Sequence, residues 1–249
     1  MLPTPSTSHV SFDTIYEPAE DSFLFLDTLS SPSESSWLKH RFSSTATPLV
    51  VEVGTGSGVV LGFVAGNSLE ILGRRDALTL GIDINRDACL ATRKTVDKTI
   101  QQNNNKKTQY ASSLMADLCR PLRANSVDVL LFNPPYVPTE ELPSLSPSFD
   151  TFQRNSYFLA LSYAGGEDGM QVTNRLLAEV PNLLTVCGVA YVLLCKQNRP
   201  HEVIDRIRSW GGGWMVESVG SSGMRAGWEK LVILRIWRPS LMSSDLNIL

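Results

Sequence analysis

Short apolar runs rich in Val, Ile and Leu alternate with helix-length segments along most of this chain. The strand-like runs lie at 48–53, 78–84, 108–112, 127–132 and 188–195, and helical patterns lie at 59–72, 86–100 and 170–184. Parallel strands must be joined by a crossover of about a dozen residues or more, usually a helix, so this alternation favours a parallel sheet. Helices are expected on both of its faces.

The last two strand-like runs, 214–219 and 230–237, break this pattern. The link between them is too short for a helical crossover, so these runs are expected to pair antiparallel. The predicted fold class is therefore α/β: a Rossmann-like sheet of seven strands, mostly parallel, with an antiparallel last strand. Two segments rich in Ser, 30–47 and 140–157, show no strand pattern and are expected to be loops.

Composition limits the classes of function. A chain of 249 residues suits one large α/β domain, and a net charge of −3 without a basic stripe argues against direct nucleic-acid binding. The three histidines are isolated and the four cysteines lack C-x-x-C spacing, which predicts no metal site and buried thiols in a reducing compartment. No signal peptide or apolar stretch of about 20 residues is visible, so a soluble intracellular protein is expected. The predicted location is the cytoplasm, with the nucleus left open as an additional one.

A glycine-rich turn, GTGSG at 54–58, follows the first predicted strand. In open parallel sheets ligands bind beyond the carboxyl ends of the strands, and glycine lets the backbone turn sharply and approach a ligand closely. The dinucleotide fingerprint fails, because the position of its third glycine is Val59. Gly54 and Gly56 therefore indicate a ligand other than NAD, or simply a strand–helix turn.

Three acidic residues lie at consecutive strand ends around this turn. Glu52 precedes the turn, Asp83 closes the second strand, and Asp117 follows the third. A carboxylate can accept hydrogen bonds from ribose hydroxyls or from an adenine amino group. Each acid alone is typical of a helix cap or a solvated loop, but together they favour an adenosine ligand without a pyrophosphate. S-adenosylmethionine fits this pattern, since its sulfonium is cationic.

The fourth strand ends in the rigid corner Asn133, Pro134, Pro135 and Tyr136. Prolines fix φ and remove backbone donors, so this corner leaves the acceptors of Asn133 and Pro134 in a rigid array beside the flat Tyr136 ring. Such an array suits methyl transfer to a planar nitrogen, whose two N–H groups need acceptors and whose lone pair must be oriented. The alternative is a turn that only terminates a strand.

Six motifs together resemble the HemK-type class I methyltransferases. They are YEPAEDSFLFLD at 16–27, VEVGTGSGVV at 51–60, GIDIN at 81–85, FNPPYVPT at 132–139, AGGEDGM at 164–170 and RAGWEKLVI at 225–233. The resemblance is closest to the eukaryotic and archaeal branch, which methylates a glutamine of the class I translation termination factor. It implies the class I S-adenosylmethionine-dependent methyltransferase fold with strand order 3-2-1-4-5-7-6.

The resemblance also implies roles for particular residues. The residues implied to bind S-adenosylmethionine are Glu52, Gly54, Asp83, Asp117, Leu118 and Asn133, and Asn133 would also bind the substrate glutamine. Tyr16, Glu20 and Asp21 would close over the methionine end of the cofactor. The alternative for Glu20 and Asp21 is a helix start after Pro18, where acidic residues favour the first turn.

The domain organisation and the partners follow from the same resemblance. An N-terminal extension, 1–47, would pack a helix on the cofactor site, 48–238 would form the catalytic domain, and 239–249 would be a mobile tail. The family implies a heterodimer with a small zinc-binding activator subunit, which we expect at the uncharged third-strand edge near 108–114. The substrate would be the GGQ glutamine of the release factor. Adenine in nucleic acid or a protein lysine is the alternative acceptor, and a non-catalytic scaffold is the third possibility.

Overall fold

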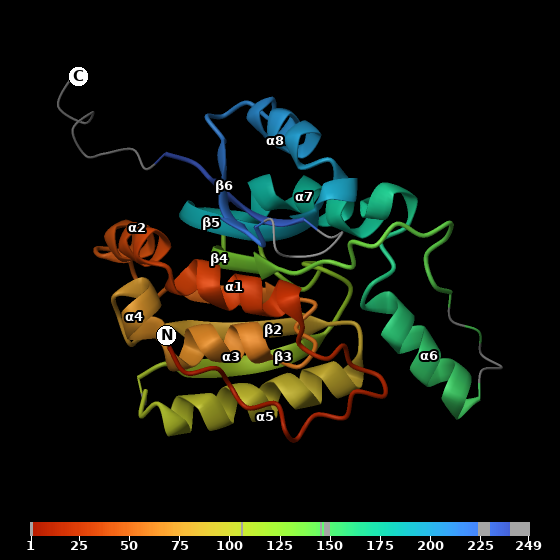
Figure 1. Cartoon of the computed structure of the whole chain (residues 1–249). Helices are drawn as coiled ribbons and strands as arrows, with labels where there is room; N and C mark the ends of the chain where they lie inside the picture. Colours follow the sequence, from red (N-terminus) through yellow and green to blue (C-terminus); the bar gives the residue numbers. More distant parts are fainter. Residues whose placement is uncertain (1, 106, 145, 147–149, 224–229, 240–249) are drawn as a thin grey trace.

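A computed structural model describes residues 2–105, 107–144, 146, 150–223 and 230–239 (Figure 1). The strands are β1 (Leu49–Val53), β2 (Leu78–Asp83), β3 (Gln109–Met115), β4 (Val127–Phe132), β5 (Leu184–Cys195), β6 (Met215–Ser221) and β7 (Leu231–Trp237). They form one sheet of order β3-β2-β1-β4-β5-β7-β6. Strands β1 to β5 are parallel and β7 runs antiparallel to both of its neighbours, which confirms the predicted fold class.

Helices cover both faces of this sheet (Figure 1). They are α1 (Glu20–Ser30), α2 (Pro32–Phe42), α3 (Val59–Gly66), α4 (Ser68–Leu72), α5 (Arg86–Gln102), α6 (Thr151–Leu161), α7 (Gln171–Leu183) and α8 (Pro200–Arg208). Alternate strand residues enter different cores. Val50 of β1 packs with α1 to α5, whereas Val51 packs with α7 and α8. The period of two along a strand thus builds two hydrophobic layers from one buried run.

The segment 30–47 was predicted as a loop, and this prediction is wrong because it contains helix α2. The Ser31 side chain caps the helix by accepting from the Glu34 amide, and Pro32 occupies the first helical turn. Leu38 and Phe42, spaced by four residues, are both fully buried. Serine here starts a helix, since its hydroxyl satisfies a backbone donor that the helix leaves unpaired.

The other expected loop, 140–157, is also partly helical, because α6 begins at Thr151. A capping box between Asp150 and Gln153 starts this helix. The single helix predicted over 59–72 is interrupted at Asn67, whose side-chain amide donates to the Phe63 carbonyl. Helix α8 was not predicted.

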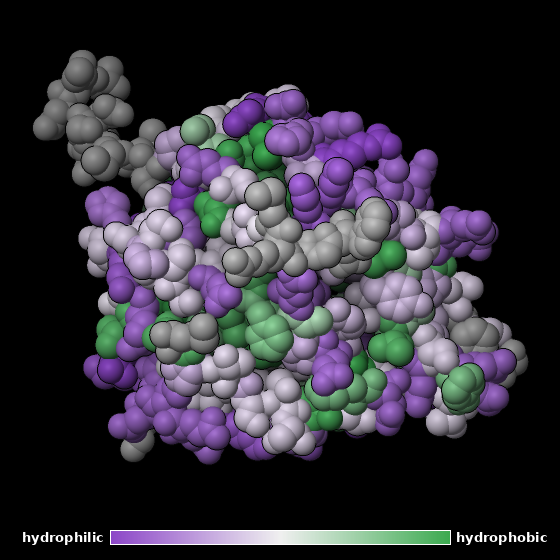
Figure 2. All heavy atoms as spheres, viewed as in Figure 1, coloured by the Kyte–Doolittle hydropathy of each residue, from purple (hydrophilic) through white to green (hydrophobic). Residues whose placement is uncertain are grey.

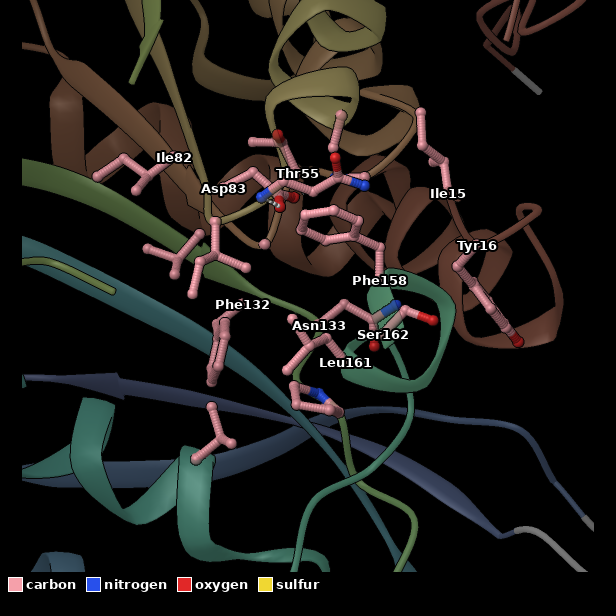
Figure 3. A pocket seen from close by; sticks show the side chains of 18 of the residues that line it. Ile15, Tyr16, Thr55, Ile82, Asp83, Phe132, Asn133, Phe158, Leu161 and Ser162 are labelled. Carbon is pink, nitrogen blue, oxygen red and sulfur yellow. Dashed lines mark hydrogen bonds between the residues drawn. The ribbon is translucent and has the colours of Figure 1, made fainter. Parts of the chain in front are cut away.

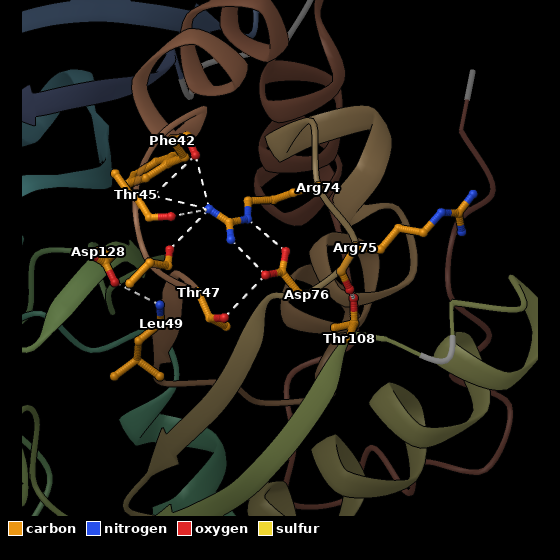
Figure 4. A network of polar contacts seen from close by, with 10 residues as sticks. Phe42, Thr45, Thr47, Leu49, Arg74, Arg75, Asp76, Thr108 and Asp128 are labelled. Atoms are coloured by element: carbon orange, nitrogen blue, oxygen red, sulfur yellow. Dashed lines mark hydrogen bonds and ion pairs between the residues drawn. The ribbon is translucent and has the colours of Figure 1, made fainter.

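The chain between α2 and β1 is fastened by Arg74 (Figure 4). Its Nη1 donates to the carbonyls of Phe42, Thr45 and Ala46, and its Nε and Nη2 donate to Asp76. These bonds satisfy the last carbonyl of α2 and two carbonyls beyond it, and tie them to the turn before β2. Residues of α1 and α2 also share one hydrophobic core with the sheet.

The prediction of buried thiols is confirmed for three of the four cysteines. Cys89, Cys119 and Cys195 are buried, Cys187 is half-buried, and burial raises the pKa of Cys89 to about 11 and that of Cys119 to about 12.

On the face seen in Figure 2, apolar areas are small and separated by polar side chains. None of the described helices has the length and apolar character that a bilayer crossing requires. Residues 225–229 of RAGWEKLVI and 240–249 of the predicted tail lie outside the described residues.

Candidate active site

A cavity of about 390 Å³ opens at the carboxyl ends of β1, β2 and β4. From β1 the chain first adds β2 and β3 on one side of the sheet and then adds β4 on the other side of β1, so the strand order reverses at this point. Ligands bind at such switch points in open α/β sheets. The predicted residues that line it are Tyr16, Asp21, Glu52, Gly54, Gly56, Asp83, Asp117, Leu118, Asn133 and Pro135. Glu20 is exposed, and Glu20, Pro134 and Tyr136 do not line the cavity. The Tyr136 ring packs instead in the core beneath α1 to α5.

The glycine turn is held by Asp83 across the strand ends. Gly54 and Gly56 have φ values of 67° and 50°, in the left-handed region that favours glycine. The Gly56 amide donates to Asp83 Oδ2 at 2.9 Å, and Asp83 Oδ1 accepts from the Asn85 amide at 2.8 Å. A Cβ at Gly56 would meet nothing within 4 Å, so the backbone of the turn is open to a ligand.

Glu52 is a buried carboxyl beneath this turn, with only 3% of its surface exposed. Its Oε2 accepts from the Leu61 amide at 2.9 Å, which anchors the first turn of α3. Burial raises the pKa of Glu52 well above its usual value, and the charge of Asp83 adds to this shift. Burial also raises the pKa of Asp83, against the lowering effect of its backbone hydrogen bonds. Two desolvated carboxyls side by side favour a ligand with hydroxyls or positive charge.

Asp117 and Leu118 close the β3 side of the cavity. Asp117 accepts from Arg175 at 2.5 Å, and Arg120 lies 3.7 Å from the same oxygen. Leu118 has a φ of 51°, which a bulky side chain rarely adopts. The Leu118 side chain lines the cavity.

The proline corner after β4 is locked by glycines from another segment. A Cβ on Gly165 would lie 2.5 Å from the Pro135 carbonyl oxygen, and one on Gly169 would collide with the Tyr136 carbonyl. The same Tyr136 carbonyl accepts from the Asn198 side chain at 2.9 Å. The AGGEDGM motif therefore packs against the backbone of the corner.

The side chain of Asn133 points into the cavity (Figure 3). Its Nδ2 donates to Asp21 Oδ2 at 3.0 Å. Its Oδ1 is buried and accepts no hydrogen bond from any described residue. The corner thus presents one buried oxygen that can accept a bond from a ligand.

Sequence reasoning missed a whole wall of the cavity, the one that α6 contributes. Its lining residues are Tyr157, Phe158, Leu161 and Ser162, and Figure 3 shows Phe158 directed between Asp83 and Asn133. The capping pair Asp150 and Gln153 was the signal that could have revealed this helix. Thr14, Ile15 and Arg175 also line the cavity, and no pattern in the sequence singles them out.

The sheet order and this site together define a class I methyltransferase. No family model matches the chain. It is 32% identical to the eRF1 methyltransferase catalytic subunit mtq2 of Schizosaccharomyces pombe, over 96% of both chains. It is 31% identical to the methyltransferase HEMK2 of Homo sapiens, over 93% of this chain and 95% of that one. These relatives show that the chain belongs to the eukaryotic HemK-type methyltransferases.

A solved structure supports the fold. The structure of the E. cuniculi Mtq2-Trm112 complex matches with a TM-score of 0.53 and 21% identity, over 91% of this chain and 99% of that one. At this identity the match concerns the fold alone.

Proposed function

We propose that this chain transfers a methyl group from S-adenosylmethionine to N5 of the glutamine in the GGQ motif of a class I translation termination factor. The observation that carries the proposal is the buried Asn133 Oδ1, which has no hydrogen-bond partner among the described residues and can accept an N–H of a planar amide. The S. pombe relative is named as an eRF1 methyltransferase catalytic subunit, and eRF1 is such a factor. The reaction would take place in the cytoplasm, where translation occurs.

The residues of the cavity fit S-adenosylmethionine. The open backbone at Gly54 and Gly56 can approach the ligand, and the carboxyls of Glu52 and Asp83 match its hydroxyls and positive charge. Asp117 and Leu118 would hold the adenine end, with Tyr16 at the methionine end. The bound cofactor supplies an electrophilic methyl group.

The protein's task is to orient a weak nucleophile. The lone pair of an amide nitrogen is delocalised, so the amide must be held with its face toward the methyl donor. Asn133 Oδ1 would accept one of its N–H bonds, and Pro134 and Pro135 would keep the backbone of this corner rigid. Forming the new N–C bond would break the bond between the methyl group and the sulfur of the donor, and the methylated amide would then release one N–H proton to solvent water.

The test is methylation of the release factor by the purified protein with its activator and labelled S-adenosylmethionine. Wild-type release factor should be labelled, and the same factor with its GGQ glutamine replaced by alanine should not. Equal labelling of both would overturn the choice of acceptor. Labelling of neither would overturn the function.

The same proposal includes a small zinc-binding activator that pairs with strand β3. Among the described strands β3 pairs only with β2, and it carries no charged residue, whereas the opposite edge strand β6 carries Glu217. The Gln109 amide donates to Ala77, so by strand alternation the Tyr110 amide faces away from β2. An added strand can accept from that outward N–H.

Replacing Tyr110 with proline removes this donor, and Tyr110→Ala is the matched control that removes the ring but keeps the N–H. Co-purification with the activator should fall for Tyr110→Pro and for a charge at Ala111, but much less for Tyr110→Ala. If Tyr110→Pro and Ala111→Glu both co-purify with the activator as well as the wild-type protein does, the interface lies elsewhere.

A further inference from the structure

The side-chain amide of Asn133 is held by a residue far away in the chain. Asp21, in the first turn of α1, accepts from Asn133 Nδ2 at 3.0 Å across 112 positions of sequence. Asp21 is only 4% exposed, so the carboxylate end of this part-buried contact is largely shielded from bulk water. A sheltered hydrogen bond to a carboxylate is stronger than one between neutral groups.

Asp21 is itself fixed on both of its oxygens. Its Oδ1 accepts from the Ser22 amide at 2.6 Å and faces the Ser22 hydroxyl at 3.4 Å, which leaves Oδ2 for Asn133. An ionised carboxylate can only accept hydrogen bonds. The Asn133 amide must therefore turn its NH₂ group to Asp21. The opposite orientation would set two acceptors against each other.

This constraint determines which side-chain atom of Asn133 faces the substrate nitrogen. With NH₂ held by Asp21, Asn133 Oδ1 is the atom left buried without a described partner. A buried acceptor without a partner is unfavourable, and an incoming N–H relieves that cost. A freely rotating amide would offer NH₂ as often as oxygen and would repel an N–H donor half of the time.

We propose that Asp21 is a positioning residue, which orients the Asn133 amide so that Oδ1 accepts from the substrate nitrogen. The inference rests on the proposed function and deepens it. It differs from the role that the family resemblance implies, in which Asp21 closes over the methionine end of the cofactor. A ligand of the cofactor would affect binding, whereas a positioning residue affects turnover.

The sharpest variant is Asp21→Asn, which keeps the size of the side chain. Its single oxygen is retained by the Ser22 amide, so its NH₂ group meets that of Asn133. The Asn133 amide should then flip and present its NH₂ group, instead of Oδ1, to the substrate nitrogen. We expect kcat to fall about 100-fold, as for the loss of a preorganised group at a reacting centre. Cofactor affinity by calorimetry should stay close to the wild-type value.

Asp27→Asn is the matched control, because Asp27 lies on the same helix, is exposed, and does not line the cavity. It makes the same change of charge and should leave kcat unchanged. The side-chain NH₂ signal of Asn133 in NMR, assigned by its loss in Asn133→Ala, gives a readout that needs no release factor. In the wild type these NH₂ hydrogens should exchange slowly with water, and in Asp21→Asn the chemical shift of the signal should change.

The outcomes separate the alternatives. Reduced kcat with retained cofactor affinity and a shifted Asn133 signal supports the positioning role. A loss of cofactor affinity equal to the loss of turnover overturns it, and so does an unchanged kcat. Fast exchange of the Asn133 NH₂ in the wild type also overturns it, even where the variant does not fold. A failure of the proposed function would appear separately, as unlabelled release factor with the wild-type enzyme.

Discussion

The two sides of the cavity are built in opposite ways. On the glycine-turn side, Glu52 is buried beneath the turn and accepts from the Leu61 amide, and the Asp83 side chain at the end of β2 accepts from the Gly56 amide of the turn. On the other side, α6 has no buried side chain and stands apart from the sheet layers in Figure 1. It is attached at its C-terminal end, where Val137 bonds with Tyr163 and Gly165. One wall belongs to the core of the fold, and the other is attached to it.

This difference separates two tasks. Residues at buried strand ends cannot be substituted without disturbing the packing of the core, so a site built from them suits a cofactor that is the same for every substrate. A helix held by its own capping box and one attachment can vary in sequence and position at little cost to folding. We infer that acceptor recognition depends on the α6 side and that cofactor recognition depends on the glycine-turn side.

The largest effect is expected at the boundary between the two sides, at Asn133. Asn133→Ala removes the buried acceptor and should lower kcat by about 10²–10³, as for the loss of one preorganised partner of a transition state. Cofactor affinity should be largely kept, which calorimetry can measure. Near-normal turnover of this variant would remove the proline corner from the chemistry.

On the glycine-turn side, Asp83→Ala should act first on cofactor affinity. A hydrogen bond to a charged group contributes about 1.5–3 kcal/mol, so Kd for the cofactor should rise by about 10- to 100-fold. Exposed Asp87 of α5 supplies the control, since Asp87→Ala removes a nearby charge that does not line the cavity. An unchanged Kd for Asp83→Ala would exclude this carboxylate from the cofactor site.

On the α6 side, Phe158→Ala should raise KM for the release factor more than Kd for the cofactor. Full burial of such a ring is worth about 1.5–3 kcal/mol, and Phe158 is half-buried, so an increase of about 5- to 10-fold is expected. Phe152→Ala is the control, since Phe152 is 79% exposed and does not line the main cavity. A larger loss of cofactor affinity than of acceptor affinity would assign α6 to the cofactor.

The smallest effect concerns stability against pH. The pKa of Glu52 is raised well above 4.5 in the folded protein, so the folded state holds this proton more tightly than the unfolded state does. Its contribution to stability is therefore complete below about pH 4.5 and is lost as pH rises through the folded pKa. Glu52→Gln removes this dependence, so its Tm should fall less than the wild-type Tm between pH 5 and 8, by about 2–4 °C per kcal/mol. Parallel Tm curves for the two proteins would contradict the raised pKa.

Local patterns in the sequence were enough to predict the sheet and the glycine-turn side of the cavity. The runs 48–53, 78–84 and 127–132 are buried strands, and their carboxyl ends meet at one edge because the strands are parallel. Gly54, Gly56 and Asp83 therefore come together without any further information. Helix α2 and helix α6 were within reach of the same reasoning, since each carries a capping signal a few residues long.

Only the tertiary structure decided which distant side chains meet. The contact between Asp21 and Asn133 depends on how α1 packs over the end of β4, and the buried ion pair between Glu34 and Arg235 joins α2 to β7. The place of Phe158 in the cavity depends on where Val137 holds the end of α6. The patterns that predict strands and helices involve only a few neighbouring residues. The contacts between distant side chains arise from the packing of layers, which local residue spacing does not determine.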